Sequence, residues 1–151
     1  LIESYNEFDG VFVAIGNNVK RKQKLDLFFG LDAPITNIVH RNAYLSEFIS
    51  IGLGTVVMPG VMVNCDTKVG MGAILNTNSN IDHDCELGNY VHIAPGVSLA
   101  GNVIVGDNVL IGIGSCIKQD LKIGVNSLVG AGSVVVCDVK EGTTVKGNPA
   151  R

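Results

Sequence analysis

The sequence has few aromatic side chains, and tryptophan is absent from it. Aromatic residues make up 5% of the 151 residues, although 46% of the residues are hydrophobic. A layered globular core usually draws on larger side chains, whereas a narrow interior filled by Val, Ile, Leu and small residues is typical of a stacked solenoid. The composition therefore favours a solenoid, and the length suits one domain, alone or with a fragment of another.

Charge is also scarce, and no long apolar run is present. The formal net charge is -3 and the isoelectric point is near 5.5, which supplies no basic stripe for a phosphate backbone, so we expect no nucleic-acid partner. The longest uncharged run, residues 87–106, contains Asn89, Pro95, Asn102 and four glycines. Such a run is interrupted by turns, so we predict no membrane insertion.

Cysteine is too sparse for a disulfide framework. The four cysteines lie 20, 31 and 21 residues apart, which leaves no C-x-x-C pair, and no secretory signal is visible. These features favour a reducing cytoplasm. The cysteines are Cys65, Cys85, Cys116 and Cys137.

The feature that the sequence has in abundance is an aliphatic residue at every sixth position. Stepping by six from Ile51 to Val135 gives Ile, Leu or Val at all fifteen positions, a run that chance would almost never produce. The fifth place of each hexad is mostly small or β-branched. Two inward positions per six residues describe one flat side of a parallel β-helix. Three sides make an 18-residue coil, so residues 51–140 predict five coils without an insertion.

The same repeat explains four G-x-G strings that resemble nucleotide-binding loops. Each string begins at the second place of a hexad, and none opens a helix. Phosphate-binding loops require a strand before the glycines and a helix after them. We therefore interpret Gly52, Gly70, Gly112 and Gly130 as turn residues of the coil.

The segment before the repeat has a different pattern. Residues 11–15 form a short apolar run, Gly16 begins a turn and helix cap, residues 19–29 predict a helix ended by Gly30, and residues 35–39 predict a strand. We expect residues 1–42 to be part of a Rossmann-like α/β unit, with a preceding portion absent from this chain. Residues 43–151 then form the β-helix, and the residues after Val139 cap its last coil.

Several motifs together carry a resemblance to a known family. The hexads, the closing GNPAR and residues 76–116 (NTNSNIDHDCELGNYVHIAPGVSLAGNVIVGDNVLIGIGSC) resemble hexapeptide-repeat acetyltransferases of the sialic acid O-acetyltransferase and UDP-4-amino-sugar N-acetyltransferase family, of the bacillosamine type. The segment FVAIGNN resembles part of that family's nucleotide-sugar-binding unit, although the family's first strand and its glycine-rich turn are missing here. The resemblance implies a left-handed coil, a homotrimer with active sites between subunits, and acetyl-CoA as co-substrate.

His83 is the candidate general base. It occupies the third place of its hexad, which should point outward, and Asp82 and Asp84 flank it. A neighbouring carboxylate orients an imidazole and raises its basicity, although a solvated surface histidine would look the same in sequence. The resemblance assigns the base to His83 and a supporting carboxylate to Asp84, which is one methylene shorter than the glutamate common in the amino-sugar enzymes.

The resemblance also assigns residues to the co-substrate and the acceptor. It implies that His92 contacts acetyl-CoA; the alternative is a structural histidine beside Tyr90. Since His92 is nine residues beyond His83, half of a coil, the two rings should meet only if one subunit supplies each, as in a closed trimer. The other implied residues, for which a tight turn is the alternative, are Gly101, Ile113 and Ala131 in the acetyl-CoA groove and Gly16 and Asn76 near the sugar.

These residues predict direct acetyl transfer to the 4-amino group of a UDP-4-amino-4,6-dideoxy sugar, without a covalent intermediate. O-acetylation of sialic acid is the rival within the family, and the exact sugar stays open. A zinc carbonic anhydrase on the same coil would need three converging histidines, so we expect no metal. A non-catalytic structural solenoid would require a regular ladder of threonine or similar side chains on one flat face. The sequence lacks such a ladder. The cysteines have no adjacent base to make one a nucleophile.

Overall fold

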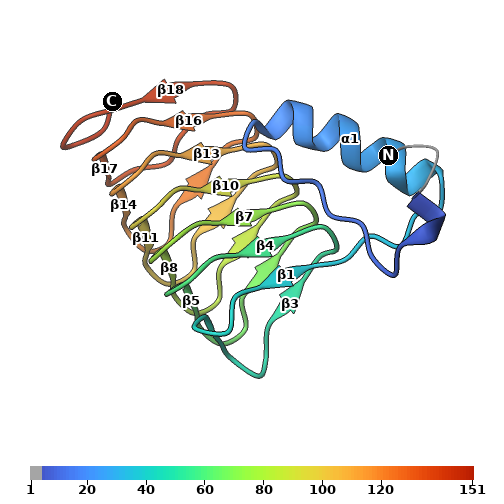
Figure 1. Cartoon of the computed structure of the whole chain (residues 1–151). Helices are drawn as coiled ribbons and strands as arrows, with labels where there is room; N and C mark the ends of the chain where they lie inside the picture. Colours follow the sequence, from blue (N-terminus) through green and yellow to red (C-terminus); the bar gives the residue numbers. More distant parts are fainter. Residues whose placement is uncertain (1–4) are drawn as a thin grey trace.

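Three parallel sheets form the walls of a prism in the computed structural model, which describes residues 5–151 (Figure 1). The seven-stranded sheet has the order β1 (Ile38–Val39), β4 (Val56–Val57), β7 (Ile74–Leu75), β10 (His92–Ile93), β13 (Leu110–Ile111), β16 (Leu128–Val129) and β18 (Thr144–Val145). The six-stranded sheet contains β2 (Tyr44–Leu45), β5 (Met62–Val63), β8 (Asn80–Ile81), β11 (Ser98–Leu99), β14 (Cys116–Ile117) and β17 (Val134–Val135). The five-stranded sheet contains β3 (Ser50–Ile51), β6 (Lys68–Val69), β9 (Glu86–Leu87), β12 (Ile104–Val105) and β15 (Lys122–Ile123).

Each strand pairs in parallel with the strand one coil away, and the register confirms the expected solenoid. Ile93, for example, pairs with Leu75 on one side and with Ile111 on the other, which is a step of 18 residues each way. The same step holds from β1 to β17, so no residue is inserted in these coils. The left hand of the coil stays a prediction from the family resemblance.

The interior confirms the two inward positions of the hexad. The first places from Val57 to Val135 and the fifth places from Thr55 to Val139 are all buried. A buried aliphatic side chain contributes about 1.5–3 kcal/mol, and each coil repeats the same layer. The outward-facing places between them can therefore hold functional side chains.

The fourth place of each hexad explains the abundance of glycine, asparagine and aspartate. From Gly54 to Gly132 this place has a positive φ of 56–75°, where residues without a bulky side chain are favoured. Tyr90, with φ 59°, is the exception. Its hydroxyl donates a hydrogen bond of 2.9 Å to Asp26 of the N-terminal helix, a contact that offsets the cost of this backbone conformation.

The N-terminal segment contains a 3-10 turn, η1 (Tyr5–Glu7), and one helix, α1 (Asn18–Gly30), as expected from residues 19–30. Asn17 is its N-cap, and its side chain accepts a hydrogen bond from the backbone of Lys20. Figure 1 shows α1 lying along one edge of the prism. The helix buries its own side chains Leu25 and Phe28.

The rest of this segment differs from the expected strand-turn-helix-strand unit. Among the described residues the run 11–15 forms a single parallel bridge, between Val11 and Ile35. The expected strand 35–39 is divided: Ile35 makes that bridge, while Ile38 and Val39 form β1 and pair with β4. The solenoid therefore begins before residue 43, since the coil register reaches back to residue 38. Residues 1–4 of the expected unit lie outside the described residues.

The C-terminal end closes the last coil, and the cysteines are unpaired. β18 pairs with β16, and a bridge joins Gly147 to Ala150. All four cysteines are free thiols. Within residues 5–151, none of the helices has the length and apolar character needed to cross a membrane.

Candidate active site

His83 lies at the corner where the six-stranded sheet turns into the five-stranded sheet; we call this turn, with its neighbours one coil above and below, the base corner. The His83 side chain is 54% exposed, as expected for the third place of a hexad. Its Nδ1 atom is 2.7 Å from Oδ2 of Asp84. The shorter carboxylate therefore reaches the ring, and Asp84 makes this contact with a positive φ of 59°.

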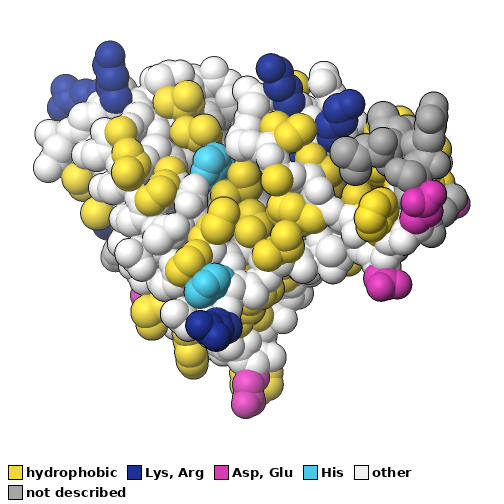
Figure 2. Space-filling model, in the orientation of Figure 1, with side chains coloured by type: hydrophobic (Ala, Val, Ile, Leu, Met, Phe, Trp, Pro, Cys, Tyr) yellow, Lys and Arg dark blue, Asp and Glu magenta, His cyan; other side chains and the backbone are white. Residues whose placement is uncertain are grey.

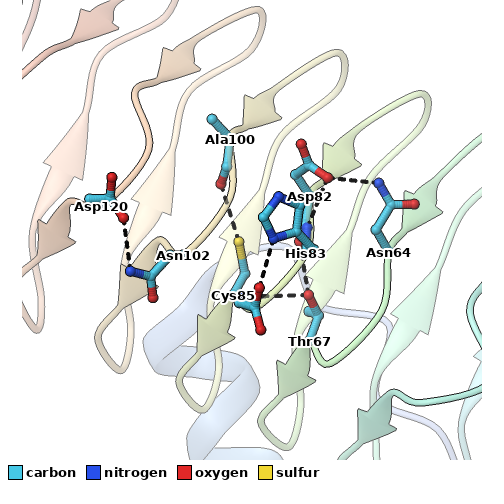
Figure 3. A network of polar contacts seen from close by, with 9 residues as sticks. Asn64, Thr67, Asp82, His83, Cys85, Ala100, Asn102 and Asp120 are labelled. Carbon is cyan, nitrogen blue, oxygen red and sulfur yellow. Dashed lines mark hydrogen bonds and ion pairs between the residues drawn. The ribbon is translucent and has the colours of Figure 1, made fainter.

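The charges around His83 strengthen it as a base. The hydrogen bond to Asp84 raises the pKa of His83, and the nearby charge of Asp82 raises it further. Asp82 is itself held in place (Figure 3): its Oδ1 accepts hydrogen bonds from Asn64 Nδ2 at 2.8 Å and from the His83 backbone at 2.9 Å. The hydrogen bond from Asn64 lowers the pKa of Asp82, so this carboxylate stays ionised.

Gly101 lies directly above the His83 ring, one coil further along the chain. A methyl group on Gly101 would be 2.6 Å from Cε1 and 2.8 Å from Nε2 of His83, so the ring occupies space that a side chain would fill. Within the described part of the chain, the Gly101 N–H donates no hydrogen bond. This backbone donor is therefore available beside the free nitrogen of the base.

A second group of residues lies on the outer face of the seven-stranded sheet. A cavity of about 230 Å³ is bounded by residues 12–16 on one side and by β4, β7 and β10 on the other. It brings Gly16, Asn76 and His92 together, three of the residues expected to bind ligands. Figure 2 shows hydrophobic side chains gathered over these strands, and no Asp, Glu, Lys or Arg lines the cavity.

His92 is held as a neutral ring with one free nitrogen. Burial lowers its pKa, and the charge of Arg21 lowers it further, while the Gly16 backbone weakly opposes the drop. Asn76 Nδ2 is 3.2 Å from His92 Nε2, and Asn76 Oδ1 accepts from the Thr77 backbone. Because the amide NH2 only donates, Nε2 accepts and the ring proton is on Nδ1. The buried Nδ1 has no hydrogen-bond partner among residues 5–151.

The remaining residues expected in the co-substrate groove lie at the corner that joins the seven-stranded sheet to the six-stranded sheet. Ile113 and Ala131 are one coil apart there, and the Ile113 side chain is exposed. The chain thus presents two half-sites. His83, Asp84 and Gly101 occupy the base corner, and the other five residues lie on or beside the seven-stranded sheet, as the half-coil separation of His83 and His92 predicts.

Two residues that the sequence reasoning missed belong to these half-sites. Asn64 fixes Asp82 from one coil below, and the 18-residue step between them would have revealed this pair. Arg21 extends from α1 and donates hydrogen bonds to the backbone of Ile15 and Gly16, which line the cavity with His92. No periodicity in the sequence connects this helix to the coil. By contrast, Cys85 occupies the inward fifth place and is buried, and burial raises the pKa of its thiol, so it is a poor nucleophile.

The described residues were also searched for side chains that could bind a metal ion. No group of three or more His, Cys, Asp or Glu side chains within residues 5–151 could hold a metal ion.

Comparisons with known proteins identify relatives of this chain. No family model matches the chain. A GDP-perosamine N-acetyltransferase of Escherichia coli O157:H7 is 39% identical over 86 residues, which are 56% of this chain and 38% of that protein, so the match spans well under half of the relative.

Solved structures match over nearly the whole chain. The acetyltransferase domain of PglB from Neisseria gonorrhoeae is 40% identical with a TM-score of 0.97, covering 100% of this chain and 75% of that one. The same domain has been solved in complex with acetyl coenzyme A; that match has 36% identity, a TM-score of 0.94, and coverage of 99% and 75%. PerB from Caulobacter crescentus, solved with CoA and GDP-perosamine, is 37% identical with a TM-score of 0.92 and coverage of 99% and 73%. The chain therefore belongs to the hexapeptide-repeat sugar N-acetyltransferase family.

Proposed function

We propose that the protein transfers an acetyl group from acetyl-CoA to the 4-amino group of a nucleotide-linked 4-amino-4,6-dideoxy sugar. The observation that carries the proposal is the His83–Asp84 contact on an outward corner beside an unoccupied backbone N–H. Related structures support the ligands, because one holds acetyl coenzyme A and another holds CoA with GDP-perosamine. The family resemblance in the sequence favours a UDP sugar, whereas these relatives make a GDP sugar an equal candidate.

The geometry supports direct transfer with His83 as general base. Nε2 of His83 takes a proton as the sugar amine attacks the thioester carbonyl, and Asp84 stabilises the imidazolium that forms. The carbonyl oxygen gains charge, for which the Gly101 N–H is the available donor; losing such a donor typically costs about 2.7–4 kcal/mol. The carbon–sulfur bond then breaks, and coenzyme A leaves as its thiolate.

The half-site at His92 supplies the co-substrate contacts. In this proposal His92 contacts acetyl-CoA, and the corner with Ile113 and Ala131 lines its groove. Gly16 and Asn76 border the cavity for the sugar nucleotide. A neutral ring suits this role, because an imidazolium would lose its acceptor contact with Asn76.

A homotrimer would complete the site by joining the base corner of one protomer to the His92 face of the next. The outward-facing strand residues of the seven-stranded and six-stranded sheets include no Asp, Glu, Lys or Arg, although Asp82 and Lys118 directly follow β8 and β14; the strands of the five-stranded sheet carry Lys68, Glu86 and Lys122. Two faces per protomer whose strands carry no charged side chain suit a closed ring in which each subunit uses one face toward each neighbour.

Turnover on defined acceptors tests the proposal. With acetyl-CoA present, we expect N-acetylation of a UDP- or GDP-linked 4-amino-4,6-dideoxy sugar and no turnover of sialic acid, measured by mass spectrometry of the product and by release of free thiol. Efficient O-acetylation of sialic acid alone would overturn the proposal in favour of the rival activity.

Asp84→Asn should move the pH dependence of the reaction. The pKa of His83 is raised, so the base is protonated at low pH and kcat/KM should rise as pH increases through a value above the ordinary one for histidine. Removing the carboxylate removes the largest cause of that rise, so the ascending limb should shift to lower pH while the plateau rate falls. The control is Glu86→Gln, which removes a carboxylate of the five-stranded sheet that is bonded to Lys68 of the same sheet. This variant should leave the ascending limb of the pH profile in place. An unmoved limb in Asp84→Asn would argue against this pair.

A further inference from the structure

Arg21 is a fully buried arginine that no carboxylate pairs with. Its exposure is 0%, and none of the ion pairs among residues 5–151 includes it. Burial lowers its pKa to about 10, so the guanidinium still carries its charge at neutral pH. A buried charge is costly unless hydrogen bonds replace its hydration, and such an arrangement calls for an explanation.

One side of the guanidinium binds the solenoid. Nε donates to the carbonyl of Gly72 at 2.6 Å, and Nη2 donates to the carbonyl of Tyr90 at 2.8 Å. Asn18, which also accepts from Arg21 Nη2, donates to the carbonyl of Asn108 at 3.0 Å. These three carbonyls follow one another at 18-residue steps at the corner between the five-stranded and seven-stranded sheets. Arg21 and Asn18 therefore tie the start of α1 to three successive coils.

The other side of the guanidinium binds the wall of the ligand cavity. Nη1 donates to the carbonyls of Ile15 and Gly16, each at 3.0 Å. Both residues line the cavity that contains Asn76 and His92. One side chain thus connects the cavity wall to the coils behind it, and its charge lies close enough to His92 to favour the neutral ring.

We propose that Arg21 is a positioning residue for the reaction: it holds the Ile15–Gly16 turn over His92 at the spacing that the acceptor requires. This inference rests on the proposed function and adds a residue to it. The fork geometry of arginine is essential, because the donors must reach carbonyls on two sides at once. A lysine would keep the charge but would supply one compact donor group.

Two substitutions separate geometry from charge. Arg21→Lys should raise the KM for the amino-sugar acceptor about tenfold while kcat changes less, because the cavity wall loses its fixed spacing. Its His92 should titrate as in the unmodified protein. Arg21→Met should raise KM at least as far, and it should also raise the titration midpoint of His92 toward the ordinary histidine value, as followed by NMR without any substrate. If Arg21→Met does not fold, Arg21→Lys decides the geometric claim by itself.

Tyr90→Phe is the matched control. It removes the hydrogen bond to Asp26 that also fastens α1, yet it leaves the carbonyls of Ile15 and Gly16 in place. It should lower the melting temperature without changing KM or the His92 titration. The proposal is overturned if the Arg21 variants lose stability alone, as the control does. If the unmodified protein acetylates no amino sugar, the proposed function fails. The role of Arg21 is then tested by a crystal structure of Arg21→Lys: a displaced Gly16 turn supports the role, and an unmoved turn contradicts it.

Discussion

Replacing His83 with alanine should lower kcat/KM by about 10²–10⁴-fold while the fold stays intact. The side chain is more than half exposed and contributes nothing to the hydrophobic core, so its loss removes the base and leaves the packing of the coils unchanged. The rate is measured as thiol release from acetyl-CoA with the preferred amino sugar. Circular dichroism and the melting temperature report on the fold.

His40→Ala provides the comparison for this variant. His40 is partly exposed and directly follows β1, and its Nδ1 accepts a hydrogen bond from the Asn42 backbone. Its removal should leave the rate close to that of the unmodified protein. A His83 variant that also kept a near-normal rate would reject His83 as the base, and the Asp84 contact would then be a surface feature.

The hexad was sufficient to predict the solenoid because each coil repeats one local rule. A buried first and fifth place recur at every step, so the register of Ile93 between Leu75 and Ile111 follows from sequence spacing alone. The outward position of His83 follows from the same rule. The 18-residue step also implied the contact of Gly101 with the His83 ring, and the pair Asn64 and Asp82, although these follow only once the coils are known to stack without an offset.

The N-terminal segment could not be predicted in the same way. Helix α1 was foreseeable from Asn17 and Gly30, but its place on the prism depends on tertiary contacts of Arg21, Leu25 and Tyr90 that no repeat encodes. Ile38 and Val39 are an apolar pair that suits either a small α/β sheet or a first coil. In the structure these residues form β1 and pair with β4, so they belong to the first coil and extend the seven-stranded sheet by one strand.

The two half-sites make the subunit interface the central claim of this account. His83 and His92 lie on separate walls of one protomer, and catalysis in our proposal requires both. A protein with His83→Ala and a protein with His92→Ala should each be nearly inactive at low acetyl-CoA. In mixed trimers, a protomer with an intact His83 can face a protomer with an intact His92.

The most direct measurement is therefore the activity of co-refolded mixtures of these two variants. Random assembly of equal amounts should restore about one quarter of the sites, so the mixture should recover about that share of the unmodified rate. A mixture of His83→Ala with the double variant His83→Ala and His92→Ala should recover none. If differently tagged subunits co-purify in mixed trimers and the first mixture still stays as inactive as its components, each site is built within one chain and the account is contradicted.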